Sequence, residues 1–115
     1  MLALLLVDDS AAFRAVAHRA LEGAFRIVGE AENGAEALDL ATSLAPDLVL
    51  LDVQLPDIDG VDVAAALAAR DDRSTVIFTS SLDRRDVEPL LADSNVAGFI
   101  PKEELSVAAV LALLP

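Results

Sequence analysis

The chain has 115 residues, of which 55% are hydrophobic and 24% are charged. This length suits one domain with a buried core, and the composition is far from that of a disordered chain. The 20 acidic residues outnumber the eight basic ones and give a formal net charge of −12. Such a charge repels nucleic-acid phosphates and anionic lipid, so direct binding to either is not expected.

The sequence has no cysteine, which excludes disulfides and thiolate chemistry. The apolar run at its start is too short to span a bilayer and lacks the basic flank and cleavage site of a signal peptide. We therefore expect a cytoplasmic location.

The chain alternates five times between a short apolar run and an amphipathic segment. Unbroken apolar runs are typical of strands buried on both faces, and recurrence every three or four residues is typical of helices. The expected strands are Leu2–Val7, Arg26–Ala31, Asp47–Leu51, Thr75–Phe78 and Ala97–Ile100. The expected helices are Ser10 (N-cap) to Leu21, Ala35–Leu44, Val61–Ala69, Asp86–Ala92 and Glu104–Leu114.

Several residues at the ends of these segments have local interpretations. Pro89 is expected in the first turn of its helix, where proline is tolerated. Gly34 and Gly60 are expected to be turn glycines, and Asp57 and Asp59 turn aspartates.

Strands that alternate with helices favour an α/β fold, because parallel strands need crossover connections. We expect one domain over residues 1–115, built as a doubly wound five-stranded parallel sheet with helices on both faces.

Polar residues follow four of the expected strands. In an open parallel sheet, ligands bind outside the carboxyl ends of the strands, so these side chains are expected to meet at one edge. They are Asp8 and Asp9 after the first strand, Asp52 after the third, Thr79, Ser80 and Ser81 after the fourth, and Lys102 after the fifth.

Three carboxylates at one edge repel one another unless a cation neutralises them. Oxygen ligands suit Mg²⁺, with Mn²⁺ as an alternative, and a main-chain carbonyl after Asp52 is a further candidate ligand. A carboxylate can also attack a phosphoryl group and form an aspartyl phosphate, whose charge the metal and Lys102 would offset.

Four motifs together resemble the receiver domain of two-component response regulators. They are VDDS at 7–10, LLDVQLPDIDG at 50–60, VIFTSS at 76–81 and GFIPK at 98–102. The resemblance covers the whole chain in order and implies a flavodoxin-like sheet with strand order 2-1-3-4-5.

The resemblance also implies roles for individual residues. Asp52 would be the phosphoacceptor, and Lys102 would contact the phosphoryl group. Asp9 would be the main metal ligand and Asp8 a supporting one, with Asp52 and the main-chain carbonyl of Gln54 completing the protein ligands.

The family carries a switch hydroxyl at the end of the fourth strand and a switch aromatic on the fifth. Counting back from Lys102 at the family's usual interval lands on Ser80, which we favour, whereas Thr79 matches the commoner residue type. Phe99 would be the aromatic side chain. The family usually has proline directly after the lysine, whereas here Pro101 precedes it.

The resemblance implies a phosphorylation-dependent signalling switch rather than a metabolic enzyme. Its partners would be a histidine kinase or phosphotransfer protein and an output protein or domain, and a phosphorylation-dependent homodimer is left open. The chain would be either a stand-alone receiver or part of a longer regulator.

Two rival functions are considered. An aspartate-nucleophile phosphatase or phosphotransferase usually carries a DxD motif, whereas Asp8 and Asp9 are adjacent, and 115 residues leave no room for a cap over a substrate. The other rival is a receiver-like interaction domain that is not phosphorylated. His18 is expected to be solvated rather than a phosphodonor.

Overall fold

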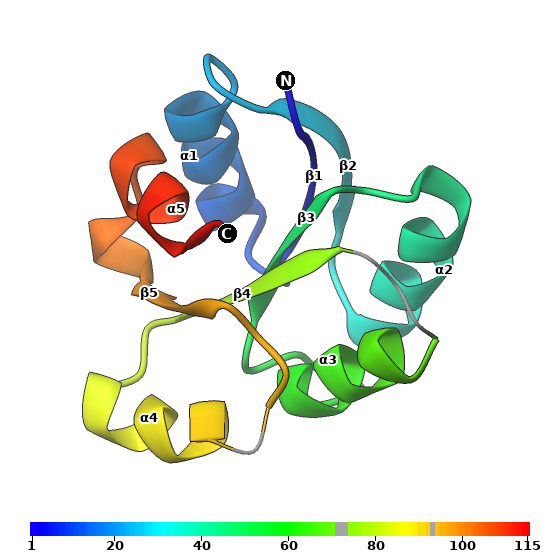
Figure 1. Cartoon of the computed structure of the whole chain (residues 1–115), viewed down its shortest axis with the longest axis vertical. Helices are drawn as coiled ribbons and strands as arrows, with labels where there is room; N and C mark the ends of the chain where they lie inside the picture. The colour runs from blue at the N-terminus through cyan, green and yellow to red at the C-terminus, as the bar shows by residue number, and fades with distance from the viewer. Residues whose placement is uncertain (71–73, 93) are drawn as a thin grey trace.

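The computed structural model describes residues 1–70, 74–92 and 94–115, which form one five-stranded parallel sheet with helices on both sides (Figure 1). The strand order is β2-β1-β3-β4-β5, so the expected fold class and strand order are confirmed. The strands are β1 Ala3–Val7, β2 Arg26–Ala31, β3 Leu48–Asp52, β4 Thr75–Ser80 and β5 Gly98–Pro101. The helices are α1 Ala11–Leu21, α2 Gly34–Leu44, α3 Gly60–Ala69, α4 Arg84–Ala92 and α5 Val107–Leu113.

The sheet separates two layers of helices. Helices α1 and α5 cover one face, and α2, α3 and α4 cover the other (Figure 1). Along β3, Leu48 and Leu50 pack toward α1 and α5, while Val49 and Leu51 belong to the cluster on the opposite face. All residues of β1 and β3 are buried, which explains why these strands, apart from Asp52 at the end of β3, are apolar without alternation.

The sequence predicted Gly34 and Gly60 to be turn glycines, but this prediction is wrong. They are the first residues of α2 and α3. Neither has a positive φ. Asn33 is the N-cap of α2, and Asp59 is the N-cap of α3. Gly60 is required by a close approach, because a Cβ there would lie 2.3 Å from the carbonyl oxygen of Asp52.

Asp57 is also more than a turn residue. Its carboxylate accepts hydrogen bonds from the backbone N–H of Gly34, at 2.7 Å, and of Ala35, at 2.9 Å. These two amides lie in the first turn of α2, so Asp57 ties the loop after β3 to the start of another helix. These hydrogen bonds lower the pKa of the Asp57 carboxyl group, and the bond from Gly34 has the largest effect.

Two expected helix positions are wrong. Helix α4 begins at Arg84, so Pro89 lies inside the helix rather than in its first turn. Helix α5 begins at Val107 rather than Glu104, because Ser106 caps it and residues Lys102–Glu104 form a separate 3₁₀ turn. Strand β4 also continues to Ser80, so two of the three hydroxyl residues lie within the strand.

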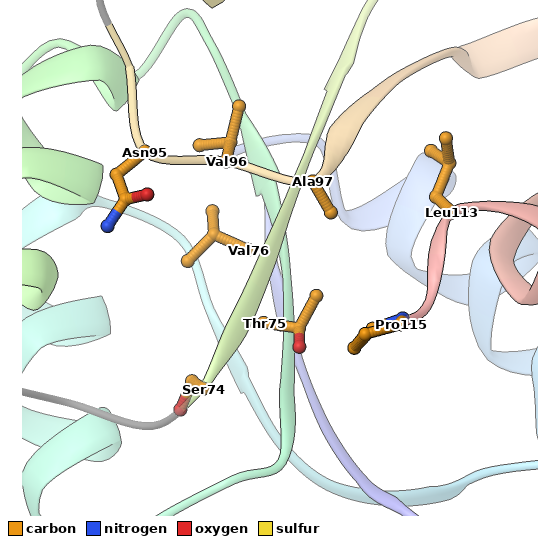
Figure 2. A pocket seen from close by; sticks show the side chains of 8 residues that line it. All are labelled: Ser74, Thr75, Val76, Asn95, Val96, Ala97, Leu113 and Pro115. Carbon is orange, nitrogen blue, oxygen red and sulfur yellow. The ribbon is translucent and has the colours of Figure 1, made fainter.

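A pocket of about 400 Å³ lies at the end of the sheet where β4 begins (Figure 2). It is formed by the start of β4, the segment before β5 and the end of the chain. Its lining residues are Ser74, Thr75, Val76, Asn95, Val96, Ala97, Leu113 and Pro115. The polar residues singled out from the sequence are at the opposite, carboxyl end of the strands. Among the described residues, no helix is long and apolar enough to cross a membrane.

Candidate functional site

The carboxyl edge of the sheet brings four of the expected residues together. Ligand oxygens of Asp8, Asp9 and Asp52 all lie within 4.8 Å of one another. The Nζ of Lys102 lies 2.7 Å from Asp8 Oδ2 and 3.0 Å from Asp52 Oδ2, and so bridges two of the carboxylates. The ammonium is the positive charge that offsets this acidic cluster in the described structure.

The two adjacent aspartates differ in their surroundings. Asp8 is 1% exposed, and its Oδ1 accepts a hydrogen bond of 2.9 Å from the backbone N–H of Ser10. Asp9 is exposed, and within the described part of the chain its carboxylate takes part in no hydrogen bond or ion pair. Asp8 therefore already has two partners, while the oxygens of Asp9 are available to a cation.

Asp52 is the last residue of β3 and is 4% exposed. Burial raises the pKa of its carboxyl group, with the charge of Asp8 adding to the rise. A hydrogen bond of 2.9 Å from the backbone N–H of Gln54 and the contact with Lys102 work in the opposite direction but do not cancel it. Gln54 thus touches Asp52 through its amide, and its carbonyl belongs to the loop beside the cluster.

Lys102 is the only lysine in the chain, and its side chain is 19% exposed. Burial lowers the pKa of its ammonium group, but the hydrogen bonds and charges of Asp8 and Asp52 outweigh that effect and raise it overall. The Nζ also lies 4.8 Å from the centroid of the Phe13 ring. The Lys102 ammonium therefore contacts Asp8, Asp52 and the ring of Phe13.

The hydroxyls of Thr79 and Ser80 are both buried but lie on opposite faces of β4. Side chains alternate along a strand, so Ser80 shares the face of Phe78, which packs with α2, α3 and α4. Its Oγ accepts a hydrogen bond of 2.9 Å from the N–H of Leu82. Thr79 is aligned with Asp52, and its Oγ1 has no hydrogen-bond partner among the described residues.

Phe99 lies on β5 and is 6% exposed, in the same cluster as Phe78. It is therefore on the same face as Ser80 and not on that of Thr79. The guanidinium carbon of Arg84, at the start of α4, lies 5.5 Å from the centroid of the Phe99 ring. The expected switch aromatic is thus packed inward beneath a positive charge.

Sequence reasoning missed three residues at this edge: Phe13, Arg14 and Arg84. Arg14 donates from Nη1 to the carbonyl oxygen of Asp8 at 2.5 Å, and from Nε to Glu30 at 3.0 Å. The one signal that could have found two of them is position, because Phe13 and Arg14 lie in the first turn of α1, directly after the acidic pair. His18 is half-exposed, as expected of a solvated residue.

The cluster is suited to a small hard cation. It supplies oxygen ligands only, and one of them is an exposed carboxylate that has no partner among residues 1–70, 74–92 and 94–115. The two buried carboxylates share a single ammonium, so part of their negative charge is left unbalanced. A carboxylate with a raised pKa beside a fixed ammonium is also suited to react with a phosphoryl group, whose oxygens the ammonium would neutralise.

The sequence and the fold of the chain are both similar to those of known proteins. The family model "Response regulator receiver domain" matches residues 4–112. CheY, a chemotaxis protein of Listeria monocytogenes, is 36% identical over 103 residues, which are 89% of this chain and 87% of CheY. NarL, a transcriptional regulatory protein of Mycobacterium tuberculosis, is 36% identical over 109 residues, which are 93% of this chain and 50% of NarL.

The solved receiver domain of Mycobacterium tuberculosis NarL has a similar structure, with a TM-score of 0.87 and 32% identity. The match covers 97% of this chain and 95% of that domain. Some relatives are much longer than this chain, which covers 56% of a regulator from Pseudomonas aeruginosa and 29% of a protein-glutamate methylesterase from Pseudoalteromonas atlantica.

Proposed function

The chain belongs to the response regulator receiver domain family, and we propose on that premise that it is a phosphorylation-dependent switch whose phosphoacceptor is Asp52. The observation that carries the proposal is the contact of 3.0 Å between the buried Asp52 carboxylate and the ammonium of the only lysine in the chain. A structural lysine would be expected at the surface, whereas this one is fixed over the acidic edge of the sheet.

The proposed reaction is a single phosphoryl transfer. An oxygen of Asp52 attacks the phosphorus of a phosphohistidine, a P–O bond forms, and the P–N bond breaks with the imidazole nitrogen keeping the electron pair. Lys102 then neutralises phosphoryl oxygens where it now contacts Asp52. Later attack by water on the phosphorus would break the P–O bond to Asp52, release inorganic phosphate and return the free carboxylate. Because Lys102 would stabilise the charge in both steps, the domain would assist its own phosphorylation and dephosphorylation without being a metabolic enzyme.

Four groups would hold the divalent cation. We assign Asp9 as the main ligand because its carboxylate is exposed and makes no hydrogen bond or ion pair with the residues that the structure describes. Asp8, Asp52 and the main-chain carbonyl of Gln54 would support it. Mg²⁺ is the expected ion and Mn²⁺ an alternative. When bound, the cation would supply positive charge to the phosphoryl oxygens.

The proposed switch runs through Ser80 and Phe99. Both lie on the face of the sheet covered by α2, α3 and α4, so a shift of Ser80 toward the phosphoryl group would change the space available to Phe99. Thr79 remains the alternative hydroxyl, because it is aligned with Asp52 and lacks a partner among the described residues. The Arg84 guanidinium over Phe99 would link this change to α4.

The partners and the context are part of the same proposal. We propose that residues 1–115 form one receiver domain in the cytoplasm, phosphorylated by a histidine kinase or phosphotransfer protein. Its output would be a protein or domain, by analogy with relatives such as the regulator NarL. Pairing of two phosphorylated copies stays a prediction.

The decisive experiment is phosphorylation by acetyl phosphate with Mg²⁺, followed by intact-protein and peptide mass spectrometry. We expect the chain to gain one phosphoryl group on Asp52, and Asp52→Asn to gain none. Asp57→Asn is the matched control, because Asp57 is an exposed aspartate in the loop that follows the same strand. Phosphorylation of Asp52→Asn, or none of the wild type, would contradict the proposal.

The same reaction separates the two rivals. An aspartate-nucleophile phosphatase would release phosphate from small phosphate esters over many turnovers, whereas a receiver would transfer about one phosphoryl group per chain. A receiver-like interaction domain would not be phosphorylated and would show no Mg²⁺-dependent change in its NMR spectrum with beryllofluoride.

A further inference from the structure

We propose that Phe13 is a positioning residue for Lys102, and that the face of its ring keeps the ammonium at the site when the carboxylates engage a cation and a phosphoryl group. The expected effect on phosphorylation rests on the proposed function, whereas the contact between Phe13 and Lys102 does not. Nζ lies 4.8 Å from the ring centroid, inside the range of about 6 Å in which a cation is attracted to an aromatic face.

The ring is fixed by the same segment that carries the acidic pair. The N–H of Phe13 donates to Ser10 Oγ at 3.1 Å, and the N–H of Ser10 donates to Asp8 Oδ1 at 2.9 Å. Asp8 Oδ2 in turn lies 2.7 Å from Lys102 Nζ. These three contacts connect Phe13 to Lys102 through Ser10 and Asp8. The N-terminal cap of α1 therefore sets the position of the ring relative to the ammonium.

An aromatic partner suits Lys102 because the charges around its ammonium would change when a cation and a phosphoryl group bind. The anionic partners of Lys102 are Asp8 and Asp52, and these are the groups that a divalent cation and a phosphoryl group would engage. A cation close to the ammonium would also repel it. Phe13 is uncharged and does not compete for the cation, so its attraction for Lys102 persists in both states.

Burial strengthens this effect. The Lys102 side chain is 19% exposed, and Phe13 packs against the apolar cluster between the sheet and helices α1 and α5. A cation over an aromatic face is held more tightly where water is excluded. Leucine at position 13 would preserve an apolar wall but remove the negative ring face, so the ammonium would be held less well.

The first measurement uses the fact that Lys102 is the only lysine. Labelling with ¹³C,¹⁵N-lysine gives a protein with a single lysine spin system, without assignment of the rest of the spectrum. The ring current of Phe13 should shift the Lys102 Hε resonances upfield. Phe13→Leu should abolish that shift, and Phe13→Tyr, which keeps the ring, should retain it. No phosphorylation is needed.

The second measurement is the rate of phosphorylation by acetyl phosphate with Mg²⁺. Phe13→Leu should slow the reaction by roughly three- to tenfold, and Phe13→Tyr should restore it. In a Lys102→Gln background, Phe13→Leu should have no further effect, because the ring then has no ammonium to hold. A purely structural role of the ring would slow both backgrounds equally.

Phe25→Leu is the matched control. It makes the same substitution in the same buried cluster, and Phe25 is 2% exposed. It should lower the melting temperature but leave the Lys102 resonances and the phosphorylation rate unchanged. If Phe13→Leu does not fold, Phe13→Met removes the ring with a more flexible side chain.

Lys102 resonances that are the same in wild type and Phe13→Leu would overturn the proposal. So would a rate effect that persists in the Lys102→Gln background, or an equal rate effect of Phe25→Leu. A wild-type chain that accepts no phosphoryl group would instead overturn the proposed function, and the upfield shift of the lysine resonance would still report the contact.

Discussion

Asp52 shows how one residue can serve the site at the expense of stability. It is 4% exposed, close to Asp8, and its pKa is raised chiefly because burial disfavours the charged form. The Lys102 ammonium reduces this cost without removing it. Carboxylates gathered in this way are typical of functional sites, where stability is given up for chemistry.

The raised pKa predicts a pH-dependent effect of Asp52→Asn in the absence of divalent cations. A group whose folded pKa lies above its unfolded value, near 3.8, contributes stability below that value and loses it as the pH rises through the folded pKa. At pH 7 the variant should therefore be more stable than wild type, and the difference should close as the pH falls toward the unfolded value of 3.8. Urea denaturation across this range measures it.

Asp39→Asn is the control for the general effect of removing one negative charge, because Asp39 is exposed on α2. A variant Asp52→Asn that is less stable than wild type at pH 7 would contradict the prediction. It would show that the pairing with Lys102 outweighs the desolvation of the carboxylate.

At the scale of elements, the junction between β3 and α3 sets the position of the phosphoacceptor. The N–H of Gly60 donates to the carbonyl oxygen of Val53 at 2.8 Å, so the first residue of α3 packs directly on the end of β3. A Cβ at position 60 would lie 2.3 Å from Asp52 O and 2.7 Å from Val53 Cα. Both are backbone atoms, which cannot rotate away.

Gly60→Ala should therefore destabilise the protein by about 2–4 kcal/mol, because β3 or α3 must shift to make room. Gly23→Ala is the matched control: a Cβ there meets nothing within 4 Å, and its effect should stay within about 0.5 kcal/mol. Thermal and urea denaturation would compare the two variants. Equal stability of both would show that the junction adjusts without cost.

At the scale of the whole molecule, the formal net charge of −12 opposes the compact state, and the acidic edge of the sheet concentrates part of that charge. A cation bound specifically at this edge would relieve the repulsion where it is greatest. Screening by monovalent salt would relieve it everywhere, and the two effects can be separated at equal ionic strength.

Mg²⁺ at ten times its Kd should raise the free energy of unfolding by about 1.4 kcal/mol through mass action. Asp9→Asn should lose most of this increment, while Asp57→Asn, an exposed aspartate outside the cluster, should keep it. Melting curves in MgCl₂ and in NaCl of matched ionic strength provide the measurement. An equal Mg²⁺ increment in Asp9→Asn would contradict a site at this edge.

The amino-acid sequence by itself determined the fold class, the strand order through its family resemblance, and which residue types end each strand. Hydrophobic periodicity and turn residues are local properties, so they can be read without knowing what packs against what. Two local predictions were nevertheless wrong. Helix α5 starts after the N-cap Ser106 rather than at Glu104, and Pro89 lies inside α4 rather than in its first turn.

Only the tertiary structure decided which partners these residues meet. Asp57 accepts hydrogen bonds from the first two amides of α2, the nearer of them 22 positions away. Lys102 bridges Asp8 and Asp52, where the sequence indicated only that the three residues share one edge of the sheet. The ring of Phe13 over Lys102 and the burial of Asp8 beside an exposed Asp9 are decided in the same way. Such contacts depend on how the helices pack on the sheet, and no local pattern in the chain encodes that packing.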